Sequence, residues 1–200
     1  MKKYRSDIPA RPTVNGTPLN QATPLSQDAI PAAWPKVRVV STDVDMRIDR
    51  EGVWHCYGSP IQRKELVCLF ASVLTRNEAG EYWLITPTEM CAVEVEDAPF
   101  LAVELFSGGA DRERIISLRS NVDEIVSVDN DHPIYVIDDP ETGEPSPYLI
   151  LRDGIEARLT RSVFYELVDL GVEEDIGGEP FFGVWSSGSF FALGKLDHNS

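Results

Sequence analysis

The sequence predicts an α+β protein with a mostly antiparallel sheet and two helices. Short apolar runs bounded by turn residues dominate from Val37 onward, and only two segments have the spacing of an amphipathic helix. Apolar and charged side chains alternate in residues 92–96, which is typical of an antiparallel strand with one solvent-exposed face. We divide the chain into a proline-rich arm (1–36) and two α+β units (37–98 and 99–196).

The arm is recognised by its composition. It contains six prolines among Thr, Ser, Gln and Asn residues, and proline fixes φ and removes a hydrogen-bond donor. Such a composition predicts an extended arm rather than a folded domain. Trp34, near the end of the arm, is placed to pin it onto the body.

Strands are expected wherever short runs rich in Val, Ile, Phe and Tyr lie between turn residues. The turn at Glu51 and Gly52 separates two early strands, and Asp153 with Gly154 marks a hairpin. A long turn is expected in residues 138–147. The expected strands are 37–40, 44–49, 52–57, 81–87, 91–97, 100–106, 114–120, 124–129, 133–138, the hairpin 148–159 and a closing strand within 183–196.

One helix is expected in each unit. In the first, Ser59 and Pro60 offer an N-cap and a first helical residue, although Ile61 could instead end a strand. In the second, Thr160 offers the N-cap and Gly171 ends the helix. The apolar stripes predicted to face the sheet are Leu66, Val67, Leu69, Phe70, Val73 and Leu74 in the first helix, and Val163, Phe164, Leu167 and Val168 in the second.

Residues 49–70 resemble residues 151–168, which predicts the duplication of a hairpin-helix-strand unit. The matched pairs are Gly52 with Gly154, Val53 with Ile155, Arg63 with Arg161, Leu66 with Phe164, and Leu69 with Leu167. The alternative is a chance similarity of two amphipathic helices. We favour duplication, because the matched glycines and arginines lie outside the apolar pattern that any such helix shares.

Composition and charge exclude several classes of partner. The net charge of −15, from 33 acidic and 18 basic residues, disfavours nucleic-acid binding, because the field of the protein would repel a phosphate backbone. No apolar run approaches the ~20 residues of a membrane span, and no apolar segment follows the basic residues at the start. The three cysteines contain no C-x-x-C pair, which favours reduced thiols. We therefore expect a cytoplasmic protein with no membrane and no nucleic-acid partner.

The motifs of catalysis and metal binding are missing from the sequence. The closing segment GVWSSGSFFALGKL lacks the G-x-S-x-G of a nucleophile elbow, and the chain has only three histidines to serve as bases. Asp129 and Asp131 begin like a calcium loop but lack its glycine and its later glutamate. No glycine-rich phosphate loop occurs in the sequence. We predict no catalytic residue, no metal site and no cofactor.

One possible binding constellation remains. Arg63 and Arg161 each open a predicted helix, where backbone N–H groups and the helix dipole favour an anion. If the repeats bring these two arginines together, they could grip a phosphorylated ligand, with Trp54, Tyr165 and Trp185 as a stacking face. In the alternative interpretation, each arginine pairs with a nearby carboxylate and orders its own repeat.

Six motifs within residues 50–195 carry a resemblance to a known family. They are GSPIQRKELVCLFASVL, YWLITPTE, VEDAPFLAVEL, LRSNVDEIVSVDNDHPI, PYLILRDGIEARLTRSVFYELV and GVWSSGSFFALG. From Trp54 onward the chain resembles a bacterial family of uncharacterised proteins, domain-of-unknown-function family 1285. The resemblance implies duplicated α+β units, a C-terminal half loosely like pleckstrin-homology folds, and a signalling role. It also implies a pocket between the halves for a nucleotide-like ligand, and it implies no established enzymatic activity.

The resemblance adds to the candidate ligand-binding residues. Under it, the closing segment is a strand with Phe190 or Phe191 in the core, and Trp185, Ser186 and Ser187 face the groove between the halves. The candidate set is completed by Arg119 and His132, which lie in one of the six motifs.

Three functions are compatible with the sequence. The first is a non-enzymatic sensing module that binds a small anionic, nucleotide-like ligand between its two halves. The second is an interaction module that binds a protein partner, for example a signalling protein, through a sheet edge and the proline-rich arm. The third is an enzyme of unrecognised type, whose turnover would be lost on mutating His132 or a carboxylate in the groove.

Overall fold

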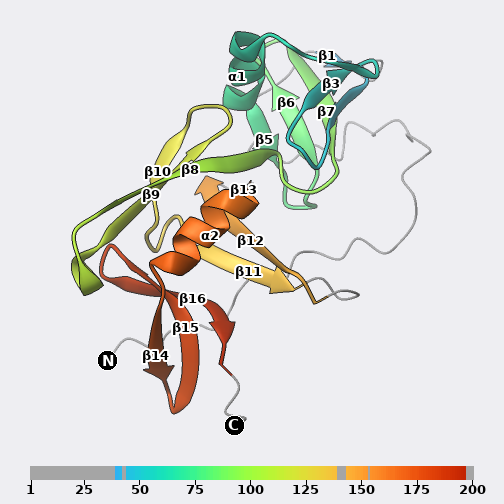
Figure 1. The fold of residues 1–200 in the computed structure, drawn as a ribbon. Helices are drawn as coiled ribbons and strands as arrows, with labels where there is room; N and C mark the ends of the chain where they lie inside the picture. Colours follow the sequence, from blue (N-terminus) through green and yellow to red (C-terminus); the bar gives the residue numbers. More distant parts are fainter. Residues whose placement is uncertain (1–38, 42–43, 139–142, 153, 197–200) are drawn as a thin grey trace.

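The computed structural model describes residues 39–41, 44–138, 143–152 and 154–196 (Figure 1). The predicted arm and Trp34 lie outside the described residues. The described part consists of a first unit up to residue 98 and a second unit from residue 99. One of the described α-helices lies in each unit.

The first unit is built around the long strand β7. Its elements are β1 (Val39–Ser41), β2 (Met46–Ile48), β3 (Trp54–Cys56), β4 (Ser59–Pro60), α1 (Lys64–Ser72), β5 (Leu74–Arg76), β6 (Tyr82–Ile85) and β7 (Glu89–Val95). The strands lie in the order β4-β3-β2-β7-β6-β5, and β1 also pairs with β7. The β1–β7 and β2–β7 pairings are parallel, and the others described in this sheet are antiparallel.

The second unit contains a six-stranded sheet and a three-stranded sheet. Its elements are β8 (Phe100–Gly108), the 3₁₀ helix η2 (Asp111–Glu113), β9 (Ile115–Ser120), β10 (Ile125–Ser127), β11 (Ile134–Asp138), β12 (Pro145–Arg152), β13 (Ile155–Leu159), α2 (Arg161–Asp169), β14 (Val172–Ile176), β15 (Glu179–Ser186) and β16 (Ser189–Lys195). The strand orders are β10-β9-β8-β13-β12-β11 and β14-β15-β16, with β8 and β13 parallel.

The α+β class and the internal duplication are confirmed. The first unit contains the β2–β3 hairpin, α1 and the antiparallel β5–β6–β7 meander, and the second contains the β12–β13 hairpin, α2 and the antiparallel β14–β15–β16 meander. The matched glycines of the two hairpin turns share a left-handed backbone, with φ of +71° at Gly52 and +75° at Gly154. The likeness of the second unit to pleckstrin-homology folds stays a prediction.

The predicted start of the first helix is wrong. Ser59 and Pro60 form β4, which pairs with β3, and the N-cap of α1 is Arg63. The reason lies in the preceding turn, where Tyr57 and Gly58 adopt φ of +48° and +72° and direct the chain back along β3. Ile61 then donates its backbone N–H to the Trp54 carbonyl at 2.7 Å, which continues the pairing beyond β4.

The helix register also differs from the predicted match. The N-caps are Arg63 in α1 and Thr160 in α2, so these two positions are equivalent and Arg161 lies one residue further on. The match of Leu69 with Leu167 is therefore wrong: Leu69 is 59% exposed, whereas Leu167 is fully buried. By the N-cap alignment, Phe70 corresponds to Leu167, and Phe70 stacks on the buried Trp54 with 6.2 Å between ring centroids.

One apolar core runs through both units. It includes Ile48 and Trp54 from the first unit and Phe100, Leu118 and Leu167 from the second, all almost fully buried. Because the same cluster continues across the junction, the two units pack as parts of one hydrophobic interior.

Candidate functional site

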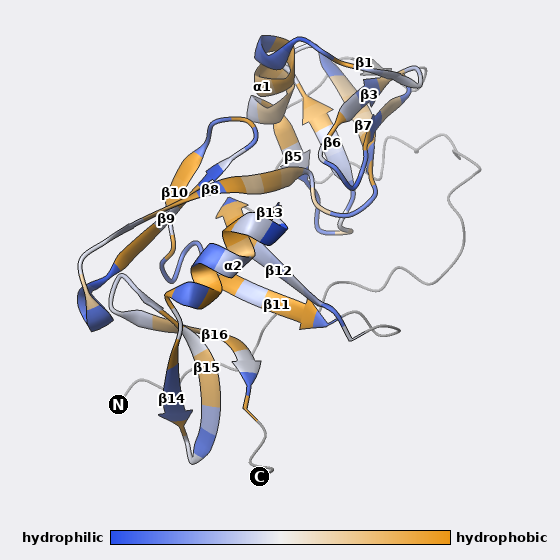
Figure 2. Ribbon diagram, viewed as in Figure 1, coloured by the Kyte–Doolittle hydropathy of each residue, from blue (hydrophilic) through white to orange (hydrophobic). Residues whose placement is uncertain are grey.

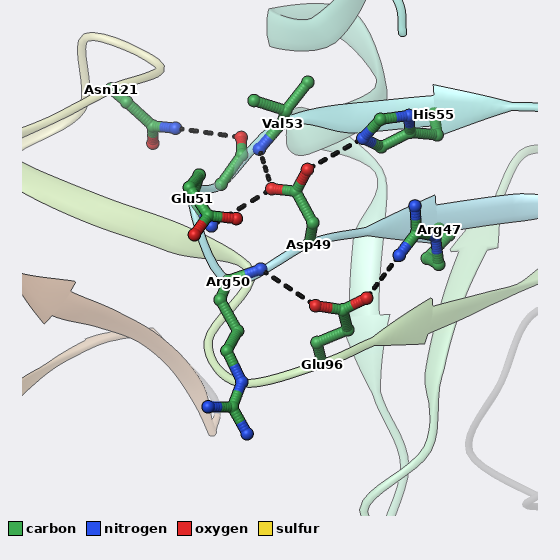
Figure 3. A network of polar contacts seen from close by, with 9 residues as sticks. Arg47, Asp49, Arg50, Glu51, Val53, His55, Glu96 and Asn121 are labelled. Carbon is green, nitrogen blue, oxygen red and sulfur yellow. Dashed lines mark hydrogen bonds and ion pairs between the residues drawn. The ribbon is translucent and has the colours of Figure 1, made fainter. Parts of the chain in front are cut away.

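The turn between β2 and β3 carries a dense polar network at the junction of the two units (Figure 3). Oδ1 of Asp49 accepts the backbone N–H groups of Glu51 at 3.0 Å and Val53 at 2.9 Å, and Oδ2 lies 2.8 Å from Nε2 of His55. An aspartate that binds backbone groups two to four residues ahead fixes a turn locally. Asp49 therefore sets the conformation of the whole turn.

The environment of Asp49 favours its ionised form. Partial burial acts to raise the pKa of Asp49, but the hydrogen bonds from His55 and from the Val53 and Glu51 N–H groups together outweigh it, and the pKa is lowered from its ordinary 3.8. The other ring nitrogen of His55, Nδ1, is buried and has no hydrogen-bond partner among the described residues. A general base must present a ring nitrogen to its substrate. Because Nε2 of His55 is held by Asp49 and Nδ1 is buried, this Asp–His pair has the geometry of a structural contact.

A second carboxylate, Glu96, closes the other side of the turn. It pairs with the Arg47 guanidinium and accepts the Arg50 backbone N–H at 3.2 Å. The side chain of Arg50 extends away from this network, as Figure 3 shows, and its guanidinium has no partner among the described residues. The turn thus holds the backbone of Arg50 rigidly and leaves its charge available.

Side chains of the second unit donate hydrogen bonds to this turn from two sides. Asn121 Nδ2 donates to the Gly52 carbonyl at 3.3 Å, while its Oδ1 accepts the Leu101 N–H at 3.1 Å. On the other side, Arg158 donates to the Arg50 carbonyl at 2.6 Å, and its Nε lies 3.1 Å from Asp97. The turn is therefore part of the junction and not a free loop.

The equivalent turn of the second repeat is held in the reciprocal way. Arg76 of the first unit donates to the Gly154 carbonyl at 3.1 Å and lies 3.3 Å from the buried Glu156. Arg152, which matches Arg50, donates to the Ala71 carbonyl at 2.7 Å near the end of α1. Each repeat thus has its hairpin turn held by side chains of the other unit. The Arg152 guanidinium is engaged, whereas that of Arg50 has no partner in the described part of the chain.

No contact among the described residues joins the two arginines predicted to bind an anion, and their joint site stays a prediction. Arg63 is exposed at the N-cap of α1, and its side chain has no partner among the described residues. Arg161 is exposed at the start of α2 and pairs with Glu144. Tyr165 is 63% exposed on α2. Since Arg161 orders its own repeat through a carboxylate, its contacts agree with the alternative interpretation of this residue.

The hydrogen bonds of Ser186 and Ser187 in the closing segment join it to other parts of the second unit. Ser186 is fully buried; its hydroxyl donates to the Val128 carbonyl at 2.7 Å and accepts the Ile116 N–H at 3.0 Å. Ser187 also donates to the Val128 carbonyl, at 3.0 Å. His132 lies in the same loop as Val128, with Nδ1 3.1 Å from Asp129. The structure therefore brings Ser186 and Ser187 to the loop that contains His132, where they tie β15 to β9.

The two tryptophans of the predicted stacking face lie in different surroundings. Trp54 is 1% exposed in the core, and its Nε1 has no hydrogen-bond partner among the described residues. Trp185 is half-buried; its Nε1 donates to Glu174 at 2.9 Å, and the Arg112 guanidinium lies 4.6 Å from its ring centroid. These contacts fasten η2, in the β8–β9 connection, onto β14 and β15. They do not form a shared stacking surface.

A surface that sequence reasoning missed lies on one side of the β8–β9–β10 ribbon. Phe106, Ile115 and Ile125 are 44%, 51% and 57% exposed, and the strand register places all three on the same face. We call this the outer face. The helix α2 contacts β8, and Figure 2 shows hydrophobic segments along the three strands. The sequence contains one signal of this surface. Ile116 and Leu118 are buried, so the side chain of Ile115 must point to the opposite, solvent-exposed face of β9, where a polar residue is expected.

The polar residues of the outer face pair with one another. The hydroxyls of Ser117 and Ser127 lie 2.9 Å apart between the apolar side chains. Arg119, one of the predicted ligand-binding residues, donates to Glu104 at 2.6 Å and to Asp123 at 2.8 Å. These hydrogen bonds with Glu104 and Asp123 raise the pKa of Arg119 above its ordinary value. The polar and charged groups named here are therefore paired, whereas the apolar side chains of this face are exposed to solvent.

Two general features are missing from the described residues. No group of three or more His, Cys, Asp or Glu side chains in the described ranges is arranged to hold a metal ion. Within those same ranges, no helix is both long and apolar enough to cross a bilayer.

Comparisons with known proteins agree with the sequence motifs and the fold. Two family models match, the N-terminal domain of DUF1285, a domain of unknown function, over residues 34–98 and the C-terminal domain of DUF1285, a protein of unknown function, over residues 99–193. The crystal structure of a DUF1285 family protein from Silicibacter pomeroyi is 40% identical, with a TM-score of 0.73, and the match covers 84% of this chain and 92% of that one. The crystal structure of a DUF1285 family protein from Shewanella baltica is 26% identical, with a TM-score of 0.50, over 64% of this chain and 94% of that one. No curated protein matches the chain. The chain belongs to the DUF1285 family.

Proposed function

We propose that this chain is a non-enzymatic binding module and that its outer face binds a partner protein. The observation that supports this proposal is the grouping of Phe106, Ile115 and Ile125 on one face that no other described element covers. Exposed apolar residues that occur singly are normal, but a group of them marks an interaction surface. Other exposed large apolar residues, such as Leu69 on α1 and Val172 on β14, belong to different elements.

Site-specific photo-crosslinking in cells tests this function. A benzophenone side chain at position 106 is expected to capture one defined protein, whereas the same group at position 69 on α1 is not. Leu69 is a matched control because it is at least as exposed as Phe106 and lies outside the outer face. Identical products from both positions, or no product from position 106, would contradict the proposal.

A small anionic ligand is the second candidate, and Arg50 favours it. Its guanidinium projects from a rigid turn at the junction, while its counterpart Arg152 bonds to Ala71 and Glu124. A duplicated arginine that loses its structural contacts in one copy is available for a ligand. The signalling role that the family resemblance implies would follow if such a ligand changed the junction.

A thermal-shift assay with nucleotides and phosphorylated metabolites tests this second candidate. A ligand that binds only the folded chain raises the melting temperature in a saturable way. We expect the shift to be lost in Arg50→Ala and kept in Arg63→Ala. Loss in Arg63→Ala alone would place the ligand at α1 instead, and a flat response in the unmodified chain would reject the candidate.

A further inference from the structure

We infer that the partner contributes an extended segment that adds as a strand to the edge of β10, and that this segment carries apolar residues flanked by Lys or Arg. This inference rests on the proposed function of the outer face and specifies how that face binds. Four observations carry it: the orientation of the β10 backbone, the character of its side chains, the adjoining apolar groups and the distribution of charge.

The backbone of β10 has one paired side and one open side. Among the described strands, β10 is the last in its sheet and pairs with β9 alone. Ser120 donates its N–H to the Glu124 carbonyl at 2.8 Å, and Val128 donates to the Ile116 carbonyl at 2.8 Å. Since backbone groups alternate along an antiparallel strand, those of Ile125 and Ser127 point toward the open side. They present two donors and two acceptors in the spacing that an added strand requires.

Four other edge strands of the described sheets are protected where β10 is not. β4 is only two residues long and ends in Pro60, and β14 carries three consecutive carboxylates at 173–175. β11 and β16 pack against each other. Charges, prolines and covering elements are the usual means of preventing strand addition. β10 has the sequence Ile-Val-Ser, with neither a charge nor a proline, and its short length suits a short docked segment.

Ile125 brings the apolar character of the outer face to this edge. Ile125 lies on β10 itself and is 57% exposed. Phe106 is the cross-strand neighbour of Ser117, and Ser117 is in turn the neighbour of Ser127 on β10. An added strand would place alternate side chains on this same face, beside Ile125. Main-chain hydrogen bonds would then supply affinity, and contacts with Ile125 would favour an apolar side chain.

Charge decides between a second copy and a basic partner. β10 is preceded by Asp123 and Glu124 and followed by Asp129 and Asp131. A second copy would carry the same net charge of −15, which opposes its approach, whereas a basic segment is attracted. Asp123 and Glu124 already pair with cations of this chain, so much of the attraction for a basic segment comes from the overall charge of −15.

Fluorescence anisotropy with synthetic peptides tests the inference. The probe is a labelled peptide of sequence KKVTVTVKK, and its control is EEVTVTVEE. The lysine peptide is expected to bind the full chain, more weakly as salt increases, and the glutamate peptide is not. Ser127→Pro removes the outward N–H and is expected to weaken binding about tenfold or more, because a ladder hydrogen bond is lost.

Matched variants distinguish strand addition at β10 from effects of the substitutions on side-chain contacts or on folding. Ser127→Ala removes the hydroxyl but keeps the N–H, so it should bind like the unmodified chain. Ile125→Glu should lose binding, whereas Leu69→Glu should not. Circular dichroism and the melting temperature report whether each variant folds. If Ser127→Pro is folded and binds as well as Ser127→Ala, or if the lysine peptide fails to bind, the inference is overturned. Specific crosslinking at position 106 would in that case still support the proposed function.

Discussion

At the residue scale, the conformation of the turn between β2 and β3 depends on a single carboxylate. Asp49 accepts hydrogen bonds from two backbone N–H groups, and its other carboxylate oxygen contacts Nε2 of His55. Asn121 of the second unit donates a hydrogen bond to the same turn. Three hydrogen bonds to one charged group contribute more than a neutral turn residue can, because hydrogen bonds to ionised groups are the stronger ones. The equivalent position in the second repeat is Leu151, which is buried, so the two turns reach the same backbone shape by different means.

Asp49→Ala is expected to lower the free energy of unfolding by about 2 kcal/mol, from the loss of charge-assisted hydrogen bonds in a partly buried site. Urea unfolding at neutral pH measures this change. Asp45→Ala is the matched control, since Asp45 is an exposed aspartate two residues before Arg47. Equal effects of the two substitutions would contradict the role assigned to Asp49.

The stability contributed by Asp49 is expected to depend on pH. Its folded-state pKa is lowered from 3.8, so the folded chain holds the proton less tightly than the unfolded chain does. The contribution is therefore complete above the unfolded pKa and is lost as pH falls through the lower folded value. Urea unfolding between about pH 6 and pH 2 should show a smaller loss of stability in Asp49→Asn than in the unmodified chain. Parallel curves would contradict this.

At the scale of elements, close contacts between strands decide which glycines are required. A Cβ on Gly183 in β15 would lie 2.3 Å from the Phe191 carbonyl oxygen and 2.6 Å from the Phe190 ring. A Cβ on Gly194 in the neighbouring strand β16 would meet nothing within 4 Å. Neither glycine has a positive φ, so packing alone distinguishes them. Gly171 is similar to Gly183, because a Cβ there would meet the Phe182 ring at 2.2 Å.

Gly183→Ala is therefore expected to destabilise the chain by about 2 kcal/mol or more through overpacking between β15 and β16. Gly194→Ala should change the free energy of unfolding by less than about 0.5 kcal/mol, as surface substitutions usually do. Thermal unfolding of both variants measures the difference. A Gly194→Ala variant as unstable as Gly183→Ala would contradict the packing explanation.

At the scale of the whole molecule, the two units are joined by a common core and by the exchange of side chains at their turns. Arg76 and Glu156 form an ion pair across the junction with side chains only 16% and 10% exposed. Removing one partner of such a pair leaves an uncompensated buried charge, which is costlier than replacing both with apolar residues. The junction is thus a part of the fold rather than a flexible linker.

We expect a single cooperative unfolding transition in which both units unfold together. Arg76→Met should lower the free energy of unfolding by about 3 kcal/mol, and Arg76→Met with Glu156→Leu should recover much of that loss. Tryptophan fluorescence and far-ultraviolet circular dichroism should report coincident curves. Two separated transitions would show that the units unfold independently, and a double variant less stable than Arg76→Met would contradict the role assigned to the ion pair.

The local parts of this architecture could be predicted from the sequence, and the long-range pairings could not. Alternation in residues 92–96 and the glycines at 52 and 154 act within a few residues, so the corresponding strand and turns are where they were expected. Ser59 was misplaced because its pairing with Cys56 competes with an equally good helix cap. Leu69 was placed in the core because periodicity locates an apolar stripe but does not set its edges.

The candidate site was predictable to a smaller extent. Arg161 and Arg63 lie at helix starts as expected, but whether they meet depends on the packing of the repeats. The Asp49–His55 contact spans only six residues, yet it forms because the β2–β3 hairpin sets the two side chains on one face. The outer face requires the register of three strands, and no pattern within a single strand contains that information.

By itself, the sequence determined the α+β class, the duplication, the order of most strands along the chain and the family, because these follow from short-range periodicity and motif identity. Only the tertiary structure decided that the repeats hold each other's turns, that Arg152 is engaged while the Arg50 guanidinium has no partner in the described part of the chain, and that Phe106, Ile115 and Ile125 share an open face. The physical reason is that these properties arise from contacts between residues far apart in the chain, whose geometry depends on how the sheets pack and not on local preference.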